Sequence, residues 1–300
     1  MRRSFAISKP PRTLVFTDLD GSLLDHDSYA WSAAAPALAE LRRRRIPLIF
    51  CTSKTAAEVR ALRKDMNNPH PFIAENGAAI VIPARYFPSV PALSGNSTPL
   101  TLVLGRTYPQ LVCDLNALAR EAQVEIRAFH QMSGREIARA TALSHPQANR
   151  ARQRLASEPF LFLRSRPAAI QRFCRRAQQK GYSVQRGGRF WHFSDGSDKG
   201  LALSLLVGFY GVAWRALIHT IALGDSANDF PMLRLVDRPI LIPRPDGTYA
   251  QEVLARMPGI TRAPSPGPAG WSTAVLRALD SSPPAAPSPN GRRPRRRSPS

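Results

Sequence analysis

Two pairs of aspartates carry the strongest chemical signal in this sequence. Asp18 and Asp20 follow the apolar run Thr13–Thr17, and Asp225 and Asp229 follow a second apolar run. Side chains two apart on an extended segment point the same way, so each strand end can offer carboxylates together. Like charges this close are unfavourable unless a cation joins them or one carboxyl group stays protonated. A helix cap would explain one acid of the second pair but not both. Oxygen ligands of this kind favour Mg²⁺ over zinc.

Two further polar positions lie at the ends of apolar segments. Thr52 and Ser53 follow the run Pro47–Cys51, where a hydroxyl group and helix-start N–H groups can hold phosphate oxygens. An ordinary helix N-cap is the alternative. Lys199 begins an uncharged segment, either as a fixed cation for phosphate or as a side chain that reaches back to water. Carboxylates, a hydroxyl group, a lysine and Mg²⁺ are together suited to stabilising a transferring phosphoryl group.

The elements that must position these groups alternate between strand and helix. Apolar runs and helical patterns predict, in order, a strand at Thr13–Thr17, a helix at Ser32–Arg45, a strand at Pro47–Cys51, a helix at Thr55–Met66, a strand at Phe72–Ala74 and a hairpin strand at Ala78–Ile82. The pattern resumes with a helix at Lys199–Tyr210, a strand at Ala216–Leu223, a helix at Asp229–Leu235 and a strand at Pro239–Ile242. This alternation predicts an α/β fold with a doubly wound parallel sheet.

The sequence pattern changes between these two halves of the chain. Residues 83–99 are rich in proline, and after them we expect strands near Leu100–Leu104, Val124–Phe129, Phe160–Leu163 and Arg189–Phe193, with helices between them. We therefore expect an inserted α+β domain at residues 84–195 and a core made of residues 13–83 and 196–280. Residues 1–12 are expected to be flexible, and the Pro/Arg/Ser-rich residues 281–300 to be a disordered tail.

The basic composition does not by itself define a partner. The 300 residues carry 42 Lys+Arg against 21 Asp+Glu, a net charge of +21. The cations are dispersed and densest in the tail, so a nucleic-acid-binding protein is the weaker alternative. Three cysteines without close spacing support neither a disulfide framework nor a zinc ribbon. The uncharged span Gly200–Trp214 is short for a bilayer and predicts a buried helix. We expect a cytoplasmic protein with no membrane partner and no specific nucleic acid.

These motifs resemble those of the haloacid dehalogenase superfamily of aspartate-based phosphatases. Its four motifs are matched in order by DLDGS at 18–22, Thr52, Lys199 and GDSAND at 224–229. Three longer segments further resemble the mannosyl-3-phosphoglycerate phosphatase family: PFIAENGAAIVIP at 71–83, EIARATALSHPQANRARQRLASEPF at 136–160 and RGGRFWHF at 186–193. The resemblance implies a doubly wound parallel-sheet core with an inserted α+β cap of the C2 type, as in Cof-like relatives.

The resemblance also implies a role for each motif residue. Asp18 is the implied nucleophile, which forms an aspartyl-phosphate, and Asp20 is the implied general acid and base. The implied Mg²⁺ ligands are Asp18, the backbone carbonyl group of Asp20 and Asp225, with Asp229 in or just outside the ligand set. The implied phosphate-binding residues are Thr52, Ser53, Lys199 and Asn228.

The implied reaction is the hydrolysis of mannosyl-3-phosphoglycerate to phosphate and mannosylglycerate, a compatible solute. Glucosyl-3-phosphoglycerate or another phosphosugar is the alternative substrate. A phosphomannomutase shares the cap type but not the family-like cap segments, and the four motifs argue against an inactive scaffold. Arg186, Arg189 and His192 are candidates to bind the glycerate carboxylate and sugar hydroxyl groups. A hairpin turn with solvated cations explains them equally well.

Overall fold

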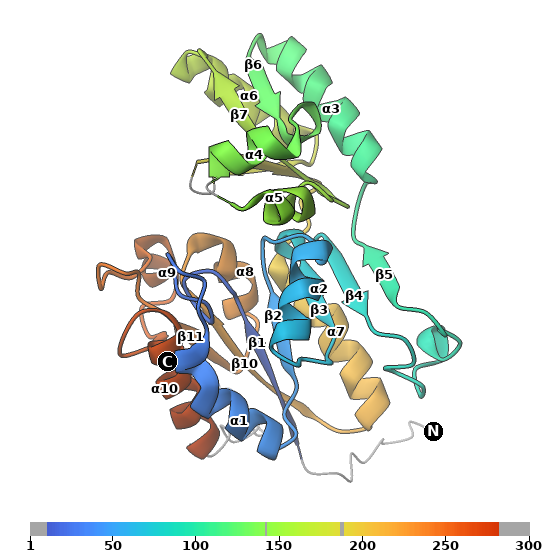
Figure 1. Ribbon diagram of the computed structural model, residues 1–300, viewed down its shortest axis with the longest axis vertical. Helices are drawn as coiled ribbons and strands as arrows, with labels where there is room; N and C mark the ends of the chain where they lie inside the picture. The colour runs from blue at the N-terminus through green and yellow to red at the C-terminus, as the bar shows by residue number, and fades with distance from the viewer. Residues whose placement is uncertain (1–10, 142, 187–188, 282–300) are drawn as a thin grey trace, which may run out of the picture.

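The computed structural model describes residues 11–141, 143–186 and 189–281. The chain forms a core that holds a large sheet and a cap inserted between the two halves of that core (Figure 1). Of the two ends expected to lack structure, residues 1–10 and 282–300 lie outside the described residues.

The core sheet has eight strands in the order β12-β11-β10-β1-β2-β3-β4-β5. Its strands are β1 (Arg12–Thr17), β2 (Leu48–Cys51), β3 (Phe72–Ala74), β4 (Ala79–Ile82), β5 (Leu100–Val103), β10 (Ile218–Gly224), β11 (Arg238–Leu241) and β12 (Thr261–Arg262). Pairing is parallel from β12 to β3 and antiparallel from β3 to β5. Successive residues of β1 pack in opposite layers, Leu14 and Phe16 in one and Val15 in the other, which is why this strand is apolar throughout.

Helices cover both faces of the core sheet (Figure 1). One layer holds α1 (Ala35–Arg43), α2 (Ala56–Asp65) and α10 (Gly267–Asp280), and the other holds α7 (Lys199–Trp214), α8 (Phe230–Leu233) and α9 (Gln251–Arg256). The pattern of apolar residues does not predict β12, α9 or α10. These elements are short or irregularly patterned, and they are stabilised by packing against the rest of their layer.

Helix α7 brings Lys199 to the sheet edge. It begins there because the Asp198 carboxylate accepts a 2.9 Å hydrogen bond from the backbone N–H of Leu201, a helix N-cap. The helix predicted to be buried is buried on its inner side only, since Leu201 on its outer side is 51% exposed. Within the described ranges, no helix has the length and apolar character to span a membrane.

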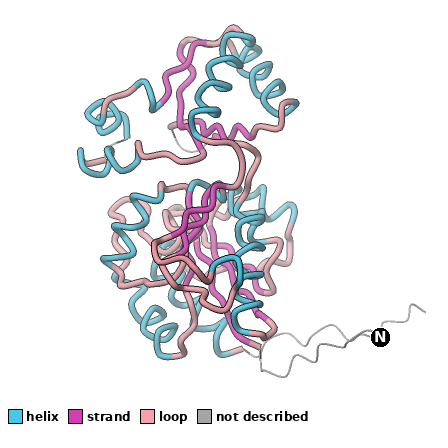
Figure 2. Tube along the Cα trace, turned by 90° about the vertical axis from the view of Figure 1, so that its right-hand side faces the viewer, coloured by secondary structure: helices cyan, strands magenta, loops and turns pink. Residues whose placement is uncertain are grey.

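The cap contains an antiparallel sheet in the order β6-β7-β9-β8. Its elements are α3 (Tyr108–Ala122), β6 (Glu125–Ala128), α4 (Gly134–Thr141), α5 (His145–Ala151), β7 (Ser157–Leu163), α6 (Pro167–Gln179), β8 (Ser183–Arg186) and β9 (Trp191–Ser194). Helices α3 and α6 pack on one face of this sheet through Leu115, Phe160 and Phe173. Helices α4 and α5 lie on the side toward the core (Figures 1 and 2).

One expected cap strand belongs to the core. The position of Leu100–Leu104 after the proline-rich segment predicts a strand of the insertion, but β5 pairs with β4 in the core sheet. Phe87, Val90 and Leu93 of the preceding segment are buried in the same core layer as α7, so this segment is also part of the core. The fourth cap strand is instead β8, which is too polar for its sequence to predict a strand.

Two linkers join the cap to the core, one between β5 and α3 and one between β9 and α7. They contact each other: the Asp195 carboxylate accepts a 2.7 Å hydrogen bond from the backbone N–H of Arg106. The two linkers therefore form a single connection, with the cap above it and the core below it (Figure 2).

Candidate active site

Three aspartates gather at the carboxyl edge of the core sheet. Asp18 follows β1 and Asp225 follows the neighbouring parallel strand β10. Asp229 lies one turn beyond, and one carboxylate oxygen from each of the three residues lies within 4.8 Å of the other two. Gly21 permits this packing, because it has a φ of +73° and a Cβ there would lie 2.7 Å from Oδ2 of Asp225. The predicted convergence of the two acidic pairs is thus realised by three of the four side chains.

This cluster fits a divalent cation. Burial raises the pKa of Asp18 well above its usual value, and the charges of Asp229 and Asp225 add to that rise against the opposing effect of Lys199. Burial, followed by the charge of Asp229, raises the pKa of Asp225 to about 6. Buried carboxylates with these pKa values are destabilised by one another, and a hard cation relieves that repulsion. The donor set is therefore one that Mg²⁺ suits.

Lys199 joins the two ends of this cluster. Its Nζ lies 2.8 Å from Oδ1 of Asp18 and 2.6 Å from Oδ1 of Asp229, and its side chain has no exposed surface. Burial alone would lower the pKa of Lys199, but the two carboxylates raise it above its usual value, so the ammonium group is charged. The other oxygen of Asp229 accepts hydrogen bonds from the backbone N–H groups of Asp225 and Ser226, which fixes the loop after β10.

The predicted phosphate-binding residues lie on two loops that are connected through one asparagine. Thr52 is buried at the end of β2, and its backbone carbonyl accepts a 2.9 Å hydrogen bond from the N–H of Asn76. The side chain of Asn76 in turn accepts a 3.1 Å hydrogen bond from Nδ2 of Asn228. Ser53 is half-buried. Asn76 was missed by sequence reasoning, although it lies in the family-like segment 71–83.

The side chain of Asp20 does not belong to the cluster of three carboxylates. Its carboxylate is 36% exposed and pairs with Lys54 at 2.9 Å. Burial lowers the pKa of Lys54, but the charges of Asp20 and Glu58 outweigh it and raise the pKa above its usual value. Lys54 is a second residue that the sequence did not assign, although it stands in the same CTSKT segment as Thr52.

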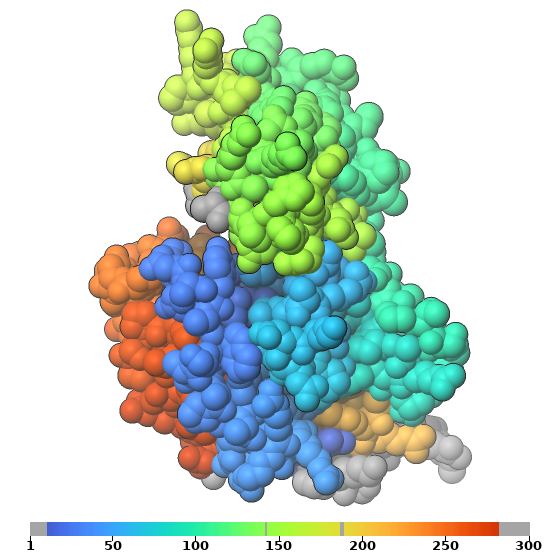
Figure 3. All heavy atoms as spheres, viewed as in Figure 1, coloured from blue at the N-terminus to red at the C-terminus, as the bar shows by residue number. Residues whose placement is uncertain are grey.

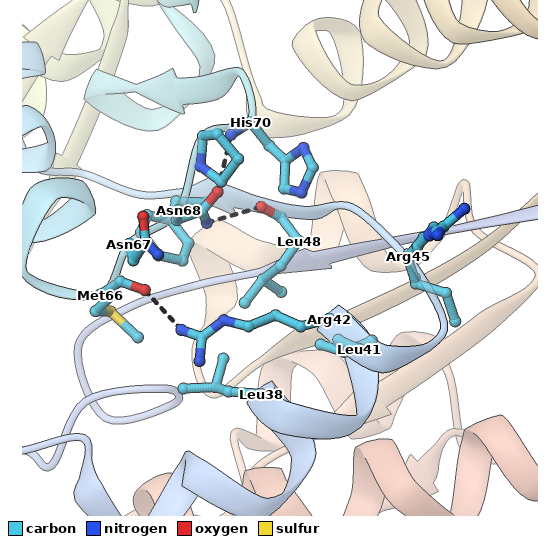
Figure 4. A pocket seen from close by; sticks show the side chains of 12 residues that line it. Leu38, Leu41, Arg42, Arg45, Leu48, Met66, Asn67, Asn68 and His70 are labelled. Carbon is cyan, nitrogen blue, oxygen red and sulfur yellow. Dashed lines mark hydrogen bonds between the residues drawn. The ribbon is translucent and has the colours of Figure 1, made fainter.

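A cavity of about 220 Å³ lies beside Lys54, between core and cap. Its walls come from the loop after β1, from α2, and from the cap around α5: Leu24, Tyr29, Lys54, Glu58, Ala61, Leu62, Asp65, Leu143, Gln147 and Arg150. Figure 3 shows the cap resting on the core surface over this region. A separate pocket of about 370 Å³ (Figure 4) is lined by Leu48 at the start of β2, the opposite end from Thr52. Only the first cavity adjoins the candidate site.

The cap residues predicted to bind the substrate mostly contact other residues of the cap. Arg186 lies over the Trp191 ring, 5.9 Å from its centre, and Arg189 donates a hydrogen bond to the carbonyl group of Ala140. Both are exposed. The pKa of His192 is lowered to about 3, first by burial and then by the positive charge of Arg154, so its imidazole is neutral. The two arginines thus fit a solvated hairpin better than a substrate pocket.

Arg154 and Glu75 connect the cap to the active-site loops, and sequence reasoning missed both. Arg154 donates from Nη1 to the backbone carbonyl group of Ser53 at 3.1 Å. Glu75 is 1% exposed and accepts hydrogen bonds from the N–H groups of Leu155 and Ala156. Both residues lie in the family-like segments, but neither has a chemical pattern that marks it before folding.

Similarity to known proteins decides the family. Residues 15–88 match the haloacid dehalogenase-like hydrolase family. A glucosyl-3-phosphoglycerate/mannosyl-3-phosphoglycerate phosphatase from Methanococcoides burtonii is 36% identical over 264 residues, which cover 88% of this chain and 96% of the relative. This chain belongs to that phosphatase family. A phosphatase of the same name from Persephonella marina is 35% identical over 89% of this chain and 97% of its own length.

Solved structures show the same fold for this phosphatase. A Thermoplasma acidophilum protein has a TM-score of 0.62 at 16% identity, covering 89% of this chain and 98% of its own. The sucrose-phosphatase of Synechocystis, solved with sucrose and phosphate, has a TM-score of 0.56 at 15% identity, covering 89% of this chain and 98% of its own. These structures share its fold, a core and a cap. The two named relatives and the family match make it a phosphoric monoester hydrolase.

Proposed function

We propose that this phosphatase hydrolyses mannosyl-3-phosphoglycerate to mannosylglycerate and phosphate in a Mg²⁺-dependent reaction. The observation that carries the proposal is the buried Asp18–Lys199–Asp229 arrangement in a chain whose relatives are named for this reaction. Mannosylglycerate is a compatible solute, and we propose that the enzyme acts in the cytoplasm.

In this proposal Asp18 is the nucleophile. Its carboxylate oxygen bonds to phosphorus as the ester P–O bond breaks, and Asp20 donates a proton to the departing glycerate oxygen. Water then attacks the aspartyl-phosphate while Asp20 takes its proton, and Asp18 leaves as the carboxylate. Lys54 lies 2.9 Å from Asp20 and helps to position this carboxyl group.

The remaining motif residues are proposed to bind the phosphate group and the metal ion. The proposed ligands of the non-bridging phosphate oxygens are Lys199, Thr52, Ser53 and Asn228. Asp18, the backbone carbonyl group of Asp20 and Asp225 are proposed to hold Mg²⁺. Asp229 already accepts hydrogen bonds at both oxygens, so we place it outside the ligand set. When bound, Mg²⁺ screens the repulsion between Asp18 and the phosphate dianion.

The proposal also names the sugar of the substrate. The names of both relatives include glucosyl-3-phosphoglycerate as well as the mannosyl compound, which makes the glucosyl compound the second candidate. The cavity beside Lys54 draws its outer wall from the cap. The cap is therefore the part of the structure that we propose selects between the two sugars.

The test is phosphate release from a panel of substrates with and without Mg²⁺. The panel holds mannosyl-3-phosphoglycerate, glucosyl-3-phosphoglycerate, mannose 6-phosphate, sucrose 6-phosphate and 3-phosphoglycerate, with Asp18→Asn measured beside the wild type. We expect the highest kcat/KM for the mannosyl compound and a loss of at least about a thousandfold in Asp18→Asn.

The other outcomes separate the parts of the proposal. A preference for the glucosyl compound would keep the mechanism and change the substrate. Equal activity on the whole panel would remove the substrate assignment. Phosphate release that Asp18→Asn leaves intact would overturn the aspartyl-phosphate mechanism.

A further inference from the structure

The cavity beside Lys54 has one cation from the core and one from the cap in its walls. Lys54 of the core and Arg150 of α5 both line this space of about 220 Å³. Arg150 is half-buried, and within the described residues its guanidinium group makes neither a hydrogen bond nor an ion pair. A guanidinium group has five N–H donors. Arg150 therefore has free donors for a ligand in the cavity.

Lys54 also has free donors. Its Nζ lies 2.9 Å from Oδ1 of Asp20, but the two groups are not aligned as a hydrogen bond, because this Oδ1 is buried without a hydrogen-bond partner among the described residues. The centre of the Tyr29 ring lies 4.9 Å from the same ammonium group, a contact that depends on charge and not on a particular N–H group. The ammonium group of Lys54 can therefore donate to a further acceptor.

The two carboxylates that line the cavity already have donors in the core. Glu58 accepts hydrogen bonds from the backbone N–H and the hydroxyl group of Thr55. Asp65 accepts a 3.0 Å hydrogen bond from the indole N–H of Trp31. The acidic groups of the cavity wall are thus paired within the core, whereas its two cations keep donors for a ligand. An anionic acceptor is the kind of group that complements this cavity.

A contact between core and cap fixes the two cations beside each other. The hydroxyl group of Thr55, the residue after Lys54, donates to the backbone carbonyl group of Arg150 at 3.0 Å. Helices α2 and α5 pack against each other at the same place. Lys54 and Arg150 therefore line one site although they come from different parts of the fold, and a ligand bound by both connects core and cap.

We propose that Lys54 and Arg150 bind the carboxylate of the glycerate group in the substrate. The inference rests on the proposed function, in which Asp20 donates a proton to the ester oxygen of a 3-phosphoglycerate. Only three bonds separate that oxygen from the carboxylate carbon. Because Lys54 contacts Asp20, a substrate with its ester oxygen at Asp20 has its carboxylate beside Lys54. Arg150 then binds the same group from the cap wall, where its planar donors match a carboxylate.

This assignment names the class of substrate that the site selects. The arginines predicted from the sequence to bind the carboxylate, Arg186 and Arg189, contact other residues of the cap. The boundary between core and cap takes their place, and it favours phosphorylated hydroxy acids whatever sugar they carry. A glycerol phosphate has a CH₂OH group where the acid has its carboxylate, so it leaves both cations without an anion.

The test compares the hydrolysis of 3-phosphoglycerate with that of the glycerol phosphate of the same configuration, which differs in this group alone. We expect the wild type to have at least about a tenfold higher kcat/KM for the acid. Arg150→Met should remove most of this preference, mainly by raising KM, because the carboxylate is bound both before and during the reaction. Arg150→Lys keeps the positive charge and should retain part of the preference.

Arg152→Met is the matched control. Arg152 directly follows α5, is exposed and does not line the cavity. Its replacement removes the same charge from the same part of the cap and should leave the preference for the acid within about twofold. Circular dichroism confirms that each variant is folded. A general attraction of anions to this basic chain would affect both variants alike, whereas a carboxylate site affects only Arg150→Met.

Two results would overturn the inference. One is a wild type without a preference for the acid, and the other is a preference that Arg150→Met leaves intact. The same assay on mannosyl- and glucosyl-3-phosphoglycerate separates this inference from the proposed function. A preference that depends on Arg150, in an enzyme that hydrolyses neither sugar compound faster than 3-phosphoglycerate, would support the carboxylate site and overturn the proposed sugar substrate. Rapid hydrolysis of the mannosyl compound by an Arg150→Met variant with an unchanged preference would do the reverse.

Discussion

The Glu75 carboxylate accepts a 2.7 Å hydrogen bond from the hydroxyl group of Ser157. Glu75 belongs to the core, in the turn between β3 and β4, and Ser157 is the first residue of the cap strand β7. With the N–H groups of Leu155 and Ala156, this contact gives one buried core carboxylate three partners in the cap. Glu75 therefore helps to fix the orientation of the cap over the site, together with Arg154, which donates to the carbonyl group of Ser53.

We predict that Glu75→Gln lowers kcat/KM for the sugar substrate by roughly tenfold or more, because an amide nitrogen cannot accept these hydrogen bonds. Activity on p-nitrophenyl phosphate, which needs no cap contact, should change less. The free energy of unfolding should fall by about 1–3 kcal/mol. The control is Glu136→Gln, since Glu136 also accepts hydrogen bonds from a serine, Ser133, but on the cap surface. Equal losses on both substrates would contradict the prediction.

Lys199→Met should abolish phosphatase activity and destabilise the protein. It leaves Asp18 and Asp229 buried without their common cation, and removing one partner of a buried ion pair costs about 3–5 kcal/mol. The exposed pair of Lys180 with Glu121 has the same 2.8 Å separation, so Lys180→Met is the matched control, with an expected cost below about 1 kcal/mol. Urea unfolding of both variants measures the difference. Similar losses would show that burial is not the cause.

Mg²⁺ should raise the thermal unfolding temperature of the wild type, and a chelator should reverse the rise. A ligand at one hundred times its dissociation constant stabilises the folded state by about 2.7 kcal/mol. Asp225→Asn should remove most of this shift because it removes one of the clustered carboxylates. Asp246→Asn, in an exposed turn, should keep it. An unchanged shift in Asp225→Asn would place the metal elsewhere.

Stability should fall on mild acidification, in part because of His70. Its Nδ1 lies 2.6 Å from the Tyr86 hydroxyl group, and burial, then the charge of Arg63, lowers its pKa to about 4. The unfolded chain therefore binds this proton more readily than the folded protein between about pH 6.5 and 4. The contribution of neutral His70 is complete above about pH 6.5 and is lost as the pH falls toward 4.

His70→Gln should flatten the pH dependence of the unfolding free energy over that interval. The glutamine does not titrate, and its carbonyl oxygen can still accept from Tyr86. Denaturant unfolding at several pH values, with wild type and variant compared at each, measures the two slopes. A variant with the slope of the wild type would contradict the role of His70.

The sequence by itself determined the chemistry and the order of the core elements. Alternating apolar runs predicted the central parallel strands, because strands covered on both faces must be apolar throughout. Polar residues directly after those runs could only meet at the carboxyl edge of the sheet. That argument placed Asp18 and Asp225 together. The four-motif resemblance added Lys199 and named the family that the comparisons confirm.

Only the tertiary structure decided which side chains connect the parts. Glu75, Asn76 and Arg154 have no periodicity or spacing that marks them, because their partners lie far away in the chain. The same is true of β5, which joins the core because an edge strand was available there. The exposed side of α7 is likewise decided by tertiary packing. An uncharged helix has the same sequence pattern whether one of its faces or all of them are covered, so the sequence does not predict which face is exposed.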